Sequence, residues 1–408
     1  MKILFVHTAY KERGGEDSVF ANELELLSEV AEVDTLTFSN SGSVLNVLKK
    51  FILAPWNYES AARLKQKINN FNPDIIHLHN WHFAASPAII SIAKKMNVPI
   101  VMTLHNYRLL CPSASLYYDG KIFLDSLDKG FPWKAVFKRV YRNSLLQTFW
   151  LAFIVHFHHW IGTWAKVDQY IALTDFGKEL FGRSKLRLKK SQIVTKGNFV
   201  KDKGYNLASR SDQFLFVGRL TKDKGIELLL EAFSGASQQL KIIGDGPLRT
   251  EVTKAANTYP NINYDGPKQH AEIIAEMKNA NALIFPSVWY EGMPMTILEA
   301  FSTGTPVLAS NLGAMKSLVV HQHNGLLFEV TESNSILHAI TAWENLSITQ
   351  KGEYCTNARH TFEANFTPEK NLNSILSIYK KTINQTNHFN NCNDIEHFTS
   401  KTLKTESV

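Results

Sequence analysis

Two carboxylates flank a turn between an apolar segment and a helix-like segment. Glu291 stands before the turn Gly292-Met293-Pro294-Met295, and Glu299 follows Glu291 after seven intervening residues. The apolar run 282–285 predicts a buried strand, and residues 296–301 predict the start of a helix. Such a turn presents free backbone N–H groups and the positive end of a helix dipole, which suit a phosphate. With carboxylates beside it for hydroxyl groups, the pattern indicates a pocket for a sugar nucleotide.

A capping box is the structural alternative for part of this segment. In Thr296-Ile-Leu-Glu299, the threonine would cap the helix and Glu299 would bond back to the turn. That alternative explains neither Glu291 nor the glycine between two apolar segments. We therefore favour the binding pocket, in which Glu299 can serve both purposes.

Two cations follow another predicted strand. Arg219 and Lys224 come just after Phe214–Val217. Arginine can hold a phosphate bidentately and lysine can bind it as a point charge, so the pair could stabilise a departing diphosphate. The alternative is a surface pair at a helix start, where cations would oppose the helix dipole. The pair therefore favours an anion-binding role.

Single residues at three further strand ends are candidates. Gly15 belongs to a Gly-Gly pair, which could also be a simple turn. His105 ends the strand 100–104, and Asp245 follows the strand 240–243. A structural role is the usual alternative for any one of the fifteen histidines. His77 and His79 have the spacing of metal ligands, but we expect structural or acceptor-side roles for them.

Taken together, these segments resemble the retaining glycosyltransferases of family 4, which have the GT-B fold. Glu291 and Glu299 are similar to the E-x7-E motif of that family, and segments 285–307 and 103–112 resemble its characteristic sequence motifs. The resemblance extends from Gly14 to about residue 383. It implies transfer of a hexose or N-acetylhexosamine from a UDP- or GDP-sugar to a glycan or lipid-linked acceptor in bacterial surface-polysaccharide synthesis.

The resemblance also implies a role for each candidate residue. Glu299 would bind the ribose, while Glu291 and the N–H groups of residues 292–295 would bind the donor sugar and phosphate. Arg219 and Lys224 would stabilise the leaving diphosphate, and His105 would position the sugar. Gly15 and Asp245 would lie in donor-binding loops. The rival functions are a sugar-nucleotide epimerase of the same fold and a non-catalytic partner subunit.

The elements that must position these residues alternate between strands and helices in both halves of the chain. The predicted strands are 3–6, 32–37, 75–78, 100–104, 169–172, 214–217, 240–243, 262–264, 282–285 and 307–309. This alternation predicts an α/β protein with two Rossmann-like, doubly wound domains that face a central cleft. The domains would span residues 1–200 on the acceptor side and 201–367 on the nucleotide-sugar side. A helix at 368–383 would cross back to the first domain, and residues 384–408 would form a flexible tail.

Composition limits the setting of the protein. No leader-like segment precedes the first strand, and the three cysteines lie far apart, which suits a reducing, cytoplasmic location. No Asp-x-Asp triplet occurs, so we expect no metal or other cofactor. Relatives commonly have an acid where this chain has Ser317, and a Cys-x-x-Cys where it has residues 122–126. The first departure could change the helix start or the sugar contacts, and the second removes any metal or disulfide at residues 122–126.

Positive charge is concentrated in the first half of the chain. The net charge is +7, and residues 129–142 and 178–203 are rich in Lys and Arg. No nucleic-acid motif accompanies them, so an anionic membrane surface or a pyrophosphate-linked acceptor is the favoured partner, with a solvated face as the alternative. The uncharged segment 145–165 places Thr148, His156, His159 and Thr163 on one side of a helix, which predicts a buried or peripheral amphipathic helix.

Overall fold

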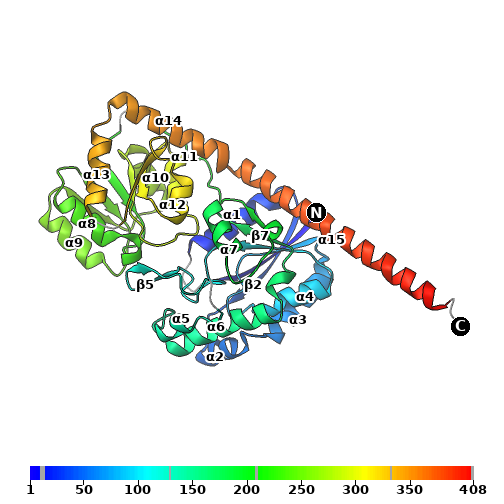
Figure 1. Cartoon of the computed structure of the whole chain (residues 1–408). Coiled ribbons are helices and arrows are strands. Elements are labelled where there is room, and N and C mark those ends of the chain that lie inside the picture. The colour runs from blue at the N-terminus through cyan, green and yellow to red at the C-terminus, as the bar shows by residue number, and fades with distance from the viewer. Residues whose placement is uncertain (10–13, 128–129, 207–209, 331–332, 406–408) are drawn as a thin grey trace.

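The chain folds into two α/β domains, each built on a six-stranded sheet, and a long terminal helix extends along them (Figure 1). The computed structural model describes residues 1–9, 14–127, 130–206, 210–330 and 333–405, with side chains described up to 386 and at 388. All ten predicted strands are present, and the pairings in both six-stranded sheets are parallel. The prediction of two doubly wound domains is confirmed.

The N-terminal sheet has the strand order β2-β1-β3-β4-β7-β8. Its strands are β1 (Lys2–Ala9), β2 (Glu32–Ser39), β3 (Ile75–Leu78), β4 (Ile100–Leu104), β7 (Gln169–Ala172) and β8 (Ile193–Thr195). The helices α1 (Gly15–Ser28), α3 (Tyr58–Phe71), α4 (Ala88–Lys95) and α7 (Asp175–Gly182) connect them. Strands β3 and β4 are buried at every position, as central strands of a sheet with two covered faces are. The edge strand β8 was not predicted because its apolar run is only two residues long.

The C-terminal sheet has the strand order β11-β10-β9-β12-β13-β14. Its strands are β9 (Phe214–Val217), β10 (Leu240–Ile243), β11 (Ile262–Gly266), β12 (Leu283–Phe285), β13 (Val307–Ser310) and β14 (Gly325–Phe328). Its helices are α8 (Ile226–Ser234), α9 (Arg249–Thr258), α10 (His270–Asn279), α11 (Met295–Ser302), α12 (Gly313–Leu318), α13 (Ser333–Glu344) and α14 (Ile348–Asn365). Strand β14 was also missed by the sequence reasoning.

Three helices and a small hairpin extend the N-terminal domain beyond its sheet. They are α2 (Val44–Leu53), α5 (Trp133–Phe137), α6 (Leu145–Trp160) and the hairpin β5 (Tyr117–Tyr118) and β6 (Lys121–Ile122). Figure 1 shows α2, α5 and α6 together at one end of the domain. Within the described residues, no helix is long and apolar enough to cross a membrane.

The polar face predicted for α6 is divided in the structure. Thr148 is fully buried, and its hydroxyl hydrogen-bonds the Tyr141 backbone. Thr163, just beyond α6, is also buried and hydrogen-bonds His158. His156 and His159 instead line a cavity. The helix is therefore not a simple amphipathic one, because two polar residues of the predicted face are satisfied inside the core.

Helix α15 (Pro368–Thr405) packs against the N-terminal domain. Ile375 and Tyr379 are fully buried in a cluster with Phe5 and Phe20, and the Tyr379 hydroxyl is 2.7 Å from Nδ1 of His77. The helix continues to Thr405, whereas we expected a tail without regular structure from residue 384. The sequence contains no glycine or proline after Pro368 to stop it, and lack of apolar periodicity does not itself end a helix. Residues 406–408 of the predicted tail, like Lys129 of the first basic group, lie outside the described residues.

Candidate active site

Loops at the carboxyl ends of the two sheets meet, as expected for ligand sites of doubly wound folds. The segment after β12 in the C-terminal domain reaches the segment after β4 in the N-terminal domain. The Tyr107 hydroxyl donates a hydrogen bond to the backbone carbonyl of Glu291 at 3.0 Å. A Cβ on Gly292 would lie 2.4 Å from the backbone oxygen of His105, so only glycine permits this approach. The structure therefore brings Glu291 and His105 into one region.

Glu291 is the centre of a buried hydrogen-bond group. Only 6% of the residue is exposed. Its Oε1 accepts hydrogen bonds from Lys224 Nζ at 2.6 Å, and from Ser287 Oγ and Trp289 Nε1 at 2.8 Å each. All three bonds are on one oxygen, and Oε2 has no hydrogen-bond partner among the described residues. The carboxylate is thus oriented by protein donors while one oxygen stays available to a ligand.

A close backbone contact brings Lys224 to Glu291. Lys224 ends the 3-10 helix η3 (Lys222–Lys224), and Gly225 follows with φ +73°. A Cβ at Gly225 would lie 2.0 Å from the carbonyl oxygen of Pro286, so the glycine lets η3 sit directly on the segment after β12. The ammonium of Lys224 also lies 5.5 Å from the ring centre of Trp289. The predicted cation and the predicted acid therefore form one pair.

A cavity of about 180 Å³ opens beside this pair. It is lined by Phe216, Val217, Gly218, Arg219, Lys224, Phe285, Pro286, Ser287 and Thr296. The side chain of Arg219 is largely exposed, and its guanidinium is 3.9 Å from Asp223. Both predicted cations thus border a cavity of suitable size for a phosphate group.

Helix α11 begins at this cavity without a side-chain cap. Pro294 occupies the N-cap position, Met295 is the first helical residue, and no side chain caps the end. Thr296 lies inside the helix, so the alternative of a Thr296–Glu299 capping box is wrong. The first N–H groups of α11 need a partner, and an anion in the cavity would provide one.

Glu299 points from α11 toward α10. Its Oε1 is 2.8 Å from Nε2 of His270, and 18% of its side chain is exposed. Burial raises the pKa of Glu299 to about 7, and the positive charge of Lys203 partly opposes this rise. An acid held in this way can accept hydrogen bonds from hydroxyl groups at the mouth of the site.

Gly15 and Asp245 lie at other strand ends. Gly15 is the first residue of α1, and a Cβ there would meet nothing within 4 Å. Its lack of a side chain leaves open space rather than relieving a contact within the protein. The Asp245 side chain is about half exposed and lies 3.7 Å from Arg249. Neither residue touches the Glu291 group, so the structure does not by itself assign them to it.

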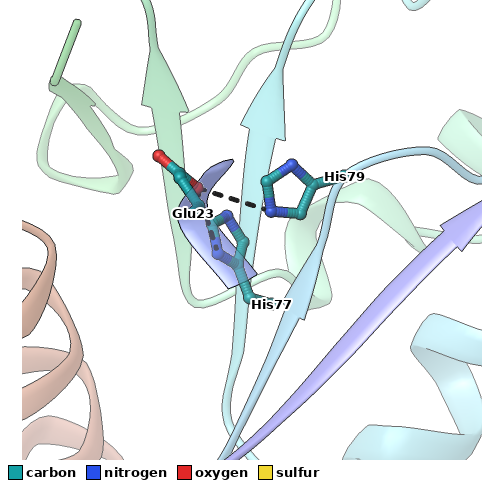
Figure 2. A group of neighbouring side chains, drawn as sticks. All are labelled: Glu23, His77 and His79. Atoms are coloured by element: carbon teal, nitrogen blue, oxygen red, sulfur yellow. Dashed lines mark ion pairs between the residues drawn. The ribbon is translucent and has the colours of Figure 1, made fainter. Parts of the chain in front are cut away.

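His105 belongs to a buried histidine network. Its Nε2 is 2.9 Å from Nδ1 of His79, whose Nε2 is 3.5 Å from Glu23. Burial lowers the pKa of His105 well below 6.5, and the neighbouring His79 lowers it further, so the ring is neutral at pH 7. Figure 2 shows Glu23 from α1 facing His77 and His79 of the β3 segment.

The group in Figure 2 has the composition of a metal site, but several of its candidate ligand atoms already have protein partners, whereas Glu23 Oε2 and His79 Nε2 have no hydrogen-bond partner among the described residues. Candidate ligand atoms of Glu23, His77 and His79 lie within 4.8 Å of one another. However, both ring nitrogens of His77 are hydrogen-bonded, to Thr103 and Tyr379 at 2.7 Å each. The Lys196 ammonium is paired with Glu23 and would repel a cation. The arrangement therefore favours a hydrogen-bonded support for His105 over a metal centre.

Sequence reasoning missed several contributors to the site. Ser287, Trp289 and Tyr107 hold Glu291 in place, while Glu23 and Lys196 support the histidines. Ser287 and Trp289 stand within the recognised segment and could have been found by their closeness to Glu291. Glu23 and Lys196 lie far apart in sequence and gave no such signal. Ser317, which replaces a common acid, is exposed on α12.

Comparisons with known proteins find glycosyltransferases among the similar proteins. The model described as Glycosyltransferase Family 4 matches residues 8–194, and the model described as Glycosyl transferases group 1 matches residues 200–365. An uncharacterised glycosyltransferase of Methanocaldococcus jannaschii is 24% identical over 394 residues, covering 93% of this chain and 98% of that protein. The Escherichia coli UDP-Gal:α-D-GlcNAc-diphosphoundecaprenol α-1,3-galactosyltransferase is 29% identical over 200 residues, covering 46% of this chain and 49% of that enzyme.

Solved structures show the same fold. The crystal structure of Anabaena HepE in complex with UDP has a TM-score of 0.66 at 16% identity, covering 93% of this chain and 100% of that one. A structure of the same protein with UDP-glucose has a TM-score of 0.62 at 15% identity, with the same coverage. The fold class is therefore GT-B, as predicted, and the family models and relatives support a glycosyltransferase.

Proposed function

We propose that the protein is a retaining glycosyltransferase that needs no metal. It transfers a hexose or N-acetylhexosamine from a UDP- or GDP-sugar to a glycan or lipid-linked saccharide in surface-polysaccharide synthesis. The observation that carries the proposal is the buried Lys224–Glu291 pair beside the uncapped start of α11. A cation, free N–H groups and an oriented carboxylate stand together where a diphosphate and a sugar would meet.

Each residue of the group has a distinct role in this proposal. Lys224, Arg219 and the backbone N–H groups of Gly292, Met293 and Met295 hold the diphosphate and stabilise its charge as it leaves. Oε2 of Glu291 accepts a hydrogen bond from a sugar hydroxyl, and Glu299 accepts those of the ribose. His105 faces the sugar from the opposite domain as a neutral hydrogen-bonding group. Gly15 and Asp245 border the donor in the same proposal.

The transfer step balances without a cofactor. The acceptor oxygen forms a bond to the anomeric carbon on the face from which the diphosphate leaves. The bond between that carbon and the diphosphate oxygen breaks, and its electron pair departs with the diphosphate. The acceptor proton passes to a phosphate oxygen. Cations and N–H groups on the leaving side are the parts that this step requires of the protein.

The first experiment is a donor screen followed by a variant pair. UDP-, GDP- and ADP-sugars are tested for thermal stabilisation of the protein, and hydrolysis or transfer of the best donor is then measured. Glu291→Gln is expected to lower turnover by about 100-fold or more, as losses of positioned transition-state groups do. Glu227→Gln, at an exposed glutamate paired with Lys222, serves as the control. Normal turnover by Glu291→Gln would reject the proposal.

The same screen separates the rival functions. An epimerase would convert the donor to a different sugar nucleotide without an acceptor. A non-catalytic subunit would neither hydrolyse nor transfer any donor, although it could still bind one.

We also propose peripheral contact with an anionic membrane at the inner face of the cytoplasmic membrane. Large apolar side chains are exposed on α2, α5 and α6, among them Leu45, Phe137, Leu146 and Trp160. The segments 44–57 and 131–163 contain six Lys or Arg and no acid. Trp150 on α6 donates a hydrogen bond to the Phe51 carbonyl at 2.6 Å, which joins these helices.

Sedimentation with vesicles tests this contact. The protein is expected to bind phosphatidylglycerol vesicles more than phosphatidylcholine vesicles and to be released by high salt. Leu146→Ser should weaken binding, while Ile348→Ser, at an exposed apolar residue of α14, should not. Binding that resists salt extraction, or that is insensitive to Leu146→Ser, would contradict the proposal.

A further inference from the structure

One cavity of the N-terminal domain lies outside the proposed donor site. A cavity of about 420 Å³ opens between α6, the loop after β4 and the segment that follows α7. Its lining comprises Arg108, Leu109, Leu110, Cys111, Pro112, Gly130, Pro132, Ala152, Val155, His156, His159, Arg183, Ser184, Lys185, Leu186 and Arg187. Four of these residues are cations and two are histidines. None of the described lining residues is acidic.

The cations of this cavity have no acidic partners. Among the described residues, no carboxylate lies within ion-pair distance of Arg108, Arg183, Lys185 or Arg187. Among the described residues, the Lys185 ammonium donates a hydrogen bond to the Gly130 carbonyl alone, at 3.1 Å. Like charges that share one cavity repel one another, and removal from water adds a cost for Arg108 and Lys185, which are partly buried, whereas Arg183 and Arg187 are exposed.

Arg108 has buried hydrogen-bond donors that lack acceptors among the described residues. Its Nε and Nη1 are buried and have no hydrogen-bond partner within the described chain. Its guanidinium lies 5.7 Å from the ring centre of Tyr141. Buried donors on a charged group are expensive to leave unbonded, so this site is built for an acceptor of hydrogen bonds that the protein itself does not supply.

Burial is the main influence on the titratable groups of this cavity, and neighbouring positive charge adds to it for the two histidines. Burial lowers the pKa of Lys185 to about 8. Burial, and then the charges of Arg187 and Lys185, lower the pKa of His159, while His156 is lowered by burial and then by Lys185. A bound anion would reverse these shifts.

One residue of this cavity, Arg108, also lies near the proposed donor site. The same arginine also lines a small cavity bordered by His79, Asn106 and His105. His105 is three residues away in sequence and faces the Glu291 turn. A ligand anchored by Arg108 can therefore extend its other end toward the region where the donor sugar would lie.

We propose that this cavity binds the phosphate or diphosphate of the acceptor substrate. The inference rests on the proposed glycosyltransferase function and identifies the acceptor as a phosphorylated or diphosphate-linked compound. Several cations without acids, with an arginine whose donors are unbonded, match a group of multiple negative oxygens. Helix α6 lines the cavity, and both α6 and the neighbouring α5 carry exposed apolar side chains that could contact the remainder of a lipid-linked acceptor.

Calorimetric titration with inorganic pyrophosphate tests the site on the full-length protein. Wild-type protein is expected to bind pyrophosphate at two sites, the donor cavity and the acceptor cavity. Arg183→Gln and Lys185→Gln should each weaken the second site by about tenfold or more, the value of one charge-assisted hydrogen bond. The exposed Lys190→Gln is the matched control, because it removes a nearby cation that does not line the cavity. Arg183 is itself exposed, so its replacement should not affect folding.

The two sites can fail independently. Lys224→Met should remove the donor-site event and leave the acceptor-site event unchanged. If Lys224→Met abolishes all pyrophosphate binding, while Arg183→Gln and Lys185→Gln bind pyrophosphate as the wild type does, the acceptor site is overturned and the donor site is upheld. If Arg183→Gln and Lys185→Gln weaken pyrophosphate binding and Lys224→Met has no effect on it, the acceptor site is upheld and the result counts against the proposed function.

Vesicles identify the source of the anion. Phosphatidylcholine vesicles with and without undecaprenyl diphosphate are sedimented with wild-type and Lys185→Gln protein. Recruitment that requires both the diphosphate and Lys185 supports a lipid-linked acceptor. Lys185-dependent binding of pyrophosphate without recruitment supports a soluble phosphorylated acceptor. If neither probe depends on Arg183 or Lys185, the cavity is not an anion site and the inference is wrong.

Discussion

The charges of the Lys224–Glu291 pair should control the affinity of the site for a nucleoside diphosphate. If Lys224 lies between Glu291 and the diphosphate, it cancels a repulsion between two anions. Lys224→Met should then weaken nucleoside diphosphate binding for two reasons. One charge-assisted hydrogen bond is lost, and the buried carboxylate is left facing the phosphate.

The structure gives the size of the second effect. Nζ of Lys224 is 2.6 Å from Glu291 Oε1. A phosphate oxygen bonded to the other side of the ammonium would be about 5 Å from that carboxylate oxygen. At an effective dielectric constant of about 20, two unit charges at this distance repel by about 3 kcal/mol. The lost hydrogen bond contributes about 1.5–3 kcal/mol more.

The double variant isolates the repulsion. Glu291→Gln in the Lys224→Met background should restore diphosphate affinity by about tenfold to 100-fold, since about 1.4 kcal/mol corresponds to a factor of ten. In the wild-type background the same change should alter affinity by less than tenfold, because Lys224 remains to bind the phosphate. The two substitutions should therefore be strongly non-additive.

Calorimetry measures both affinity and proton uptake. The probe is whichever of UDP, GDP and ADP binds the wild-type protein most tightly, titrated at pH 7 in buffers of different ionisation enthalpy. Lys224→Met protein should take up a proton on binding, because Glu291 can escape the repulsion by protonation. Lys222→Met with Glu227→Gln, an exposed pair on the same domain, should show no coupling. Additive effects at Lys224 and Glu291 would refute the placement of the lysine between the two anions.

Four further predictions follow from other parts of the site. Because the pKa of Glu299 is about 7, the carboxylate forms as pH rises from 6 to 8; donor affinity should increase over this range in wild-type protein, and the increase should be absent in Glu299→Gln. Gly292→Ala should abolish donor turnover, because its Cβ would lie 2.4 Å from the His105 carbonyl oxygen, whereas Gly352→Ala, with open space around it, should keep full activity. Tyr379→Phe should lower the free energy of unfolding by about 1–3 kcal/mol in denaturant titrations by leaving buried His77 unbonded, and exposed Tyr58→Phe should not. In ¹⁵N spectra of histidine-labelled protein, His105 should carry its proton on Nε2, from which it donates a hydrogen bond to Nδ1 of His79. A proton on Nδ1 of His105 would contradict this hydrogen bond.

The fold could be predicted almost fully from the sequence because its signals are local. Eight of the ten predicted strands are largely buried apolar runs, and the run itself indicates their burial, whereas the edge strands β2 and β11 are mostly not buried. The edge strand β8 was missed because its apolar run is only two residues long, and β14 was missed although it is largely buried. The continuation of α15 to Thr405 was missed because an unbroken polar sequence gives no periodic signal.

The site was predictable only where its chemistry lies in one segment. Glu291, Glu299 and the glycine turn share a motif, and Lys224 follows a strand end of the same sheet. The contact between Gly292 and His105 joins two domains, and no local pattern encodes it. The acceptor cavity is similarly built from residues 108–112, 130–132, 152–159 and 183–187, which only the folded chain brings together.

The orientation of His105 shows how a distant part of the chain can fix the chemistry of this site. Ionised Glu23 can only accept hydrogen bonds, and Nε2 of His79 is the ring nitrogen that faces it at 3.5 Å. If that nitrogen carries the proton of a neutral His79, the otherwise unbonded Glu23 Oε2 and His79 Nε2 satisfy each other.

Nδ1 of His79 must then be an acceptor, so His105 donates to it from Nε2 across 2.9 Å. This leaves Nδ1 of His105 as the lone-pair nitrogen, able to accept a hydrogen bond from a sugar hydroxyl but unable to donate one. The tautomer follows from a carboxylate on α1, which is in turn held by Lys196 from the segment after β8. The position of His105 at a strand end could be predicted from sequence, whereas its hydrogen-bonding character depends on this buried chain of contacts.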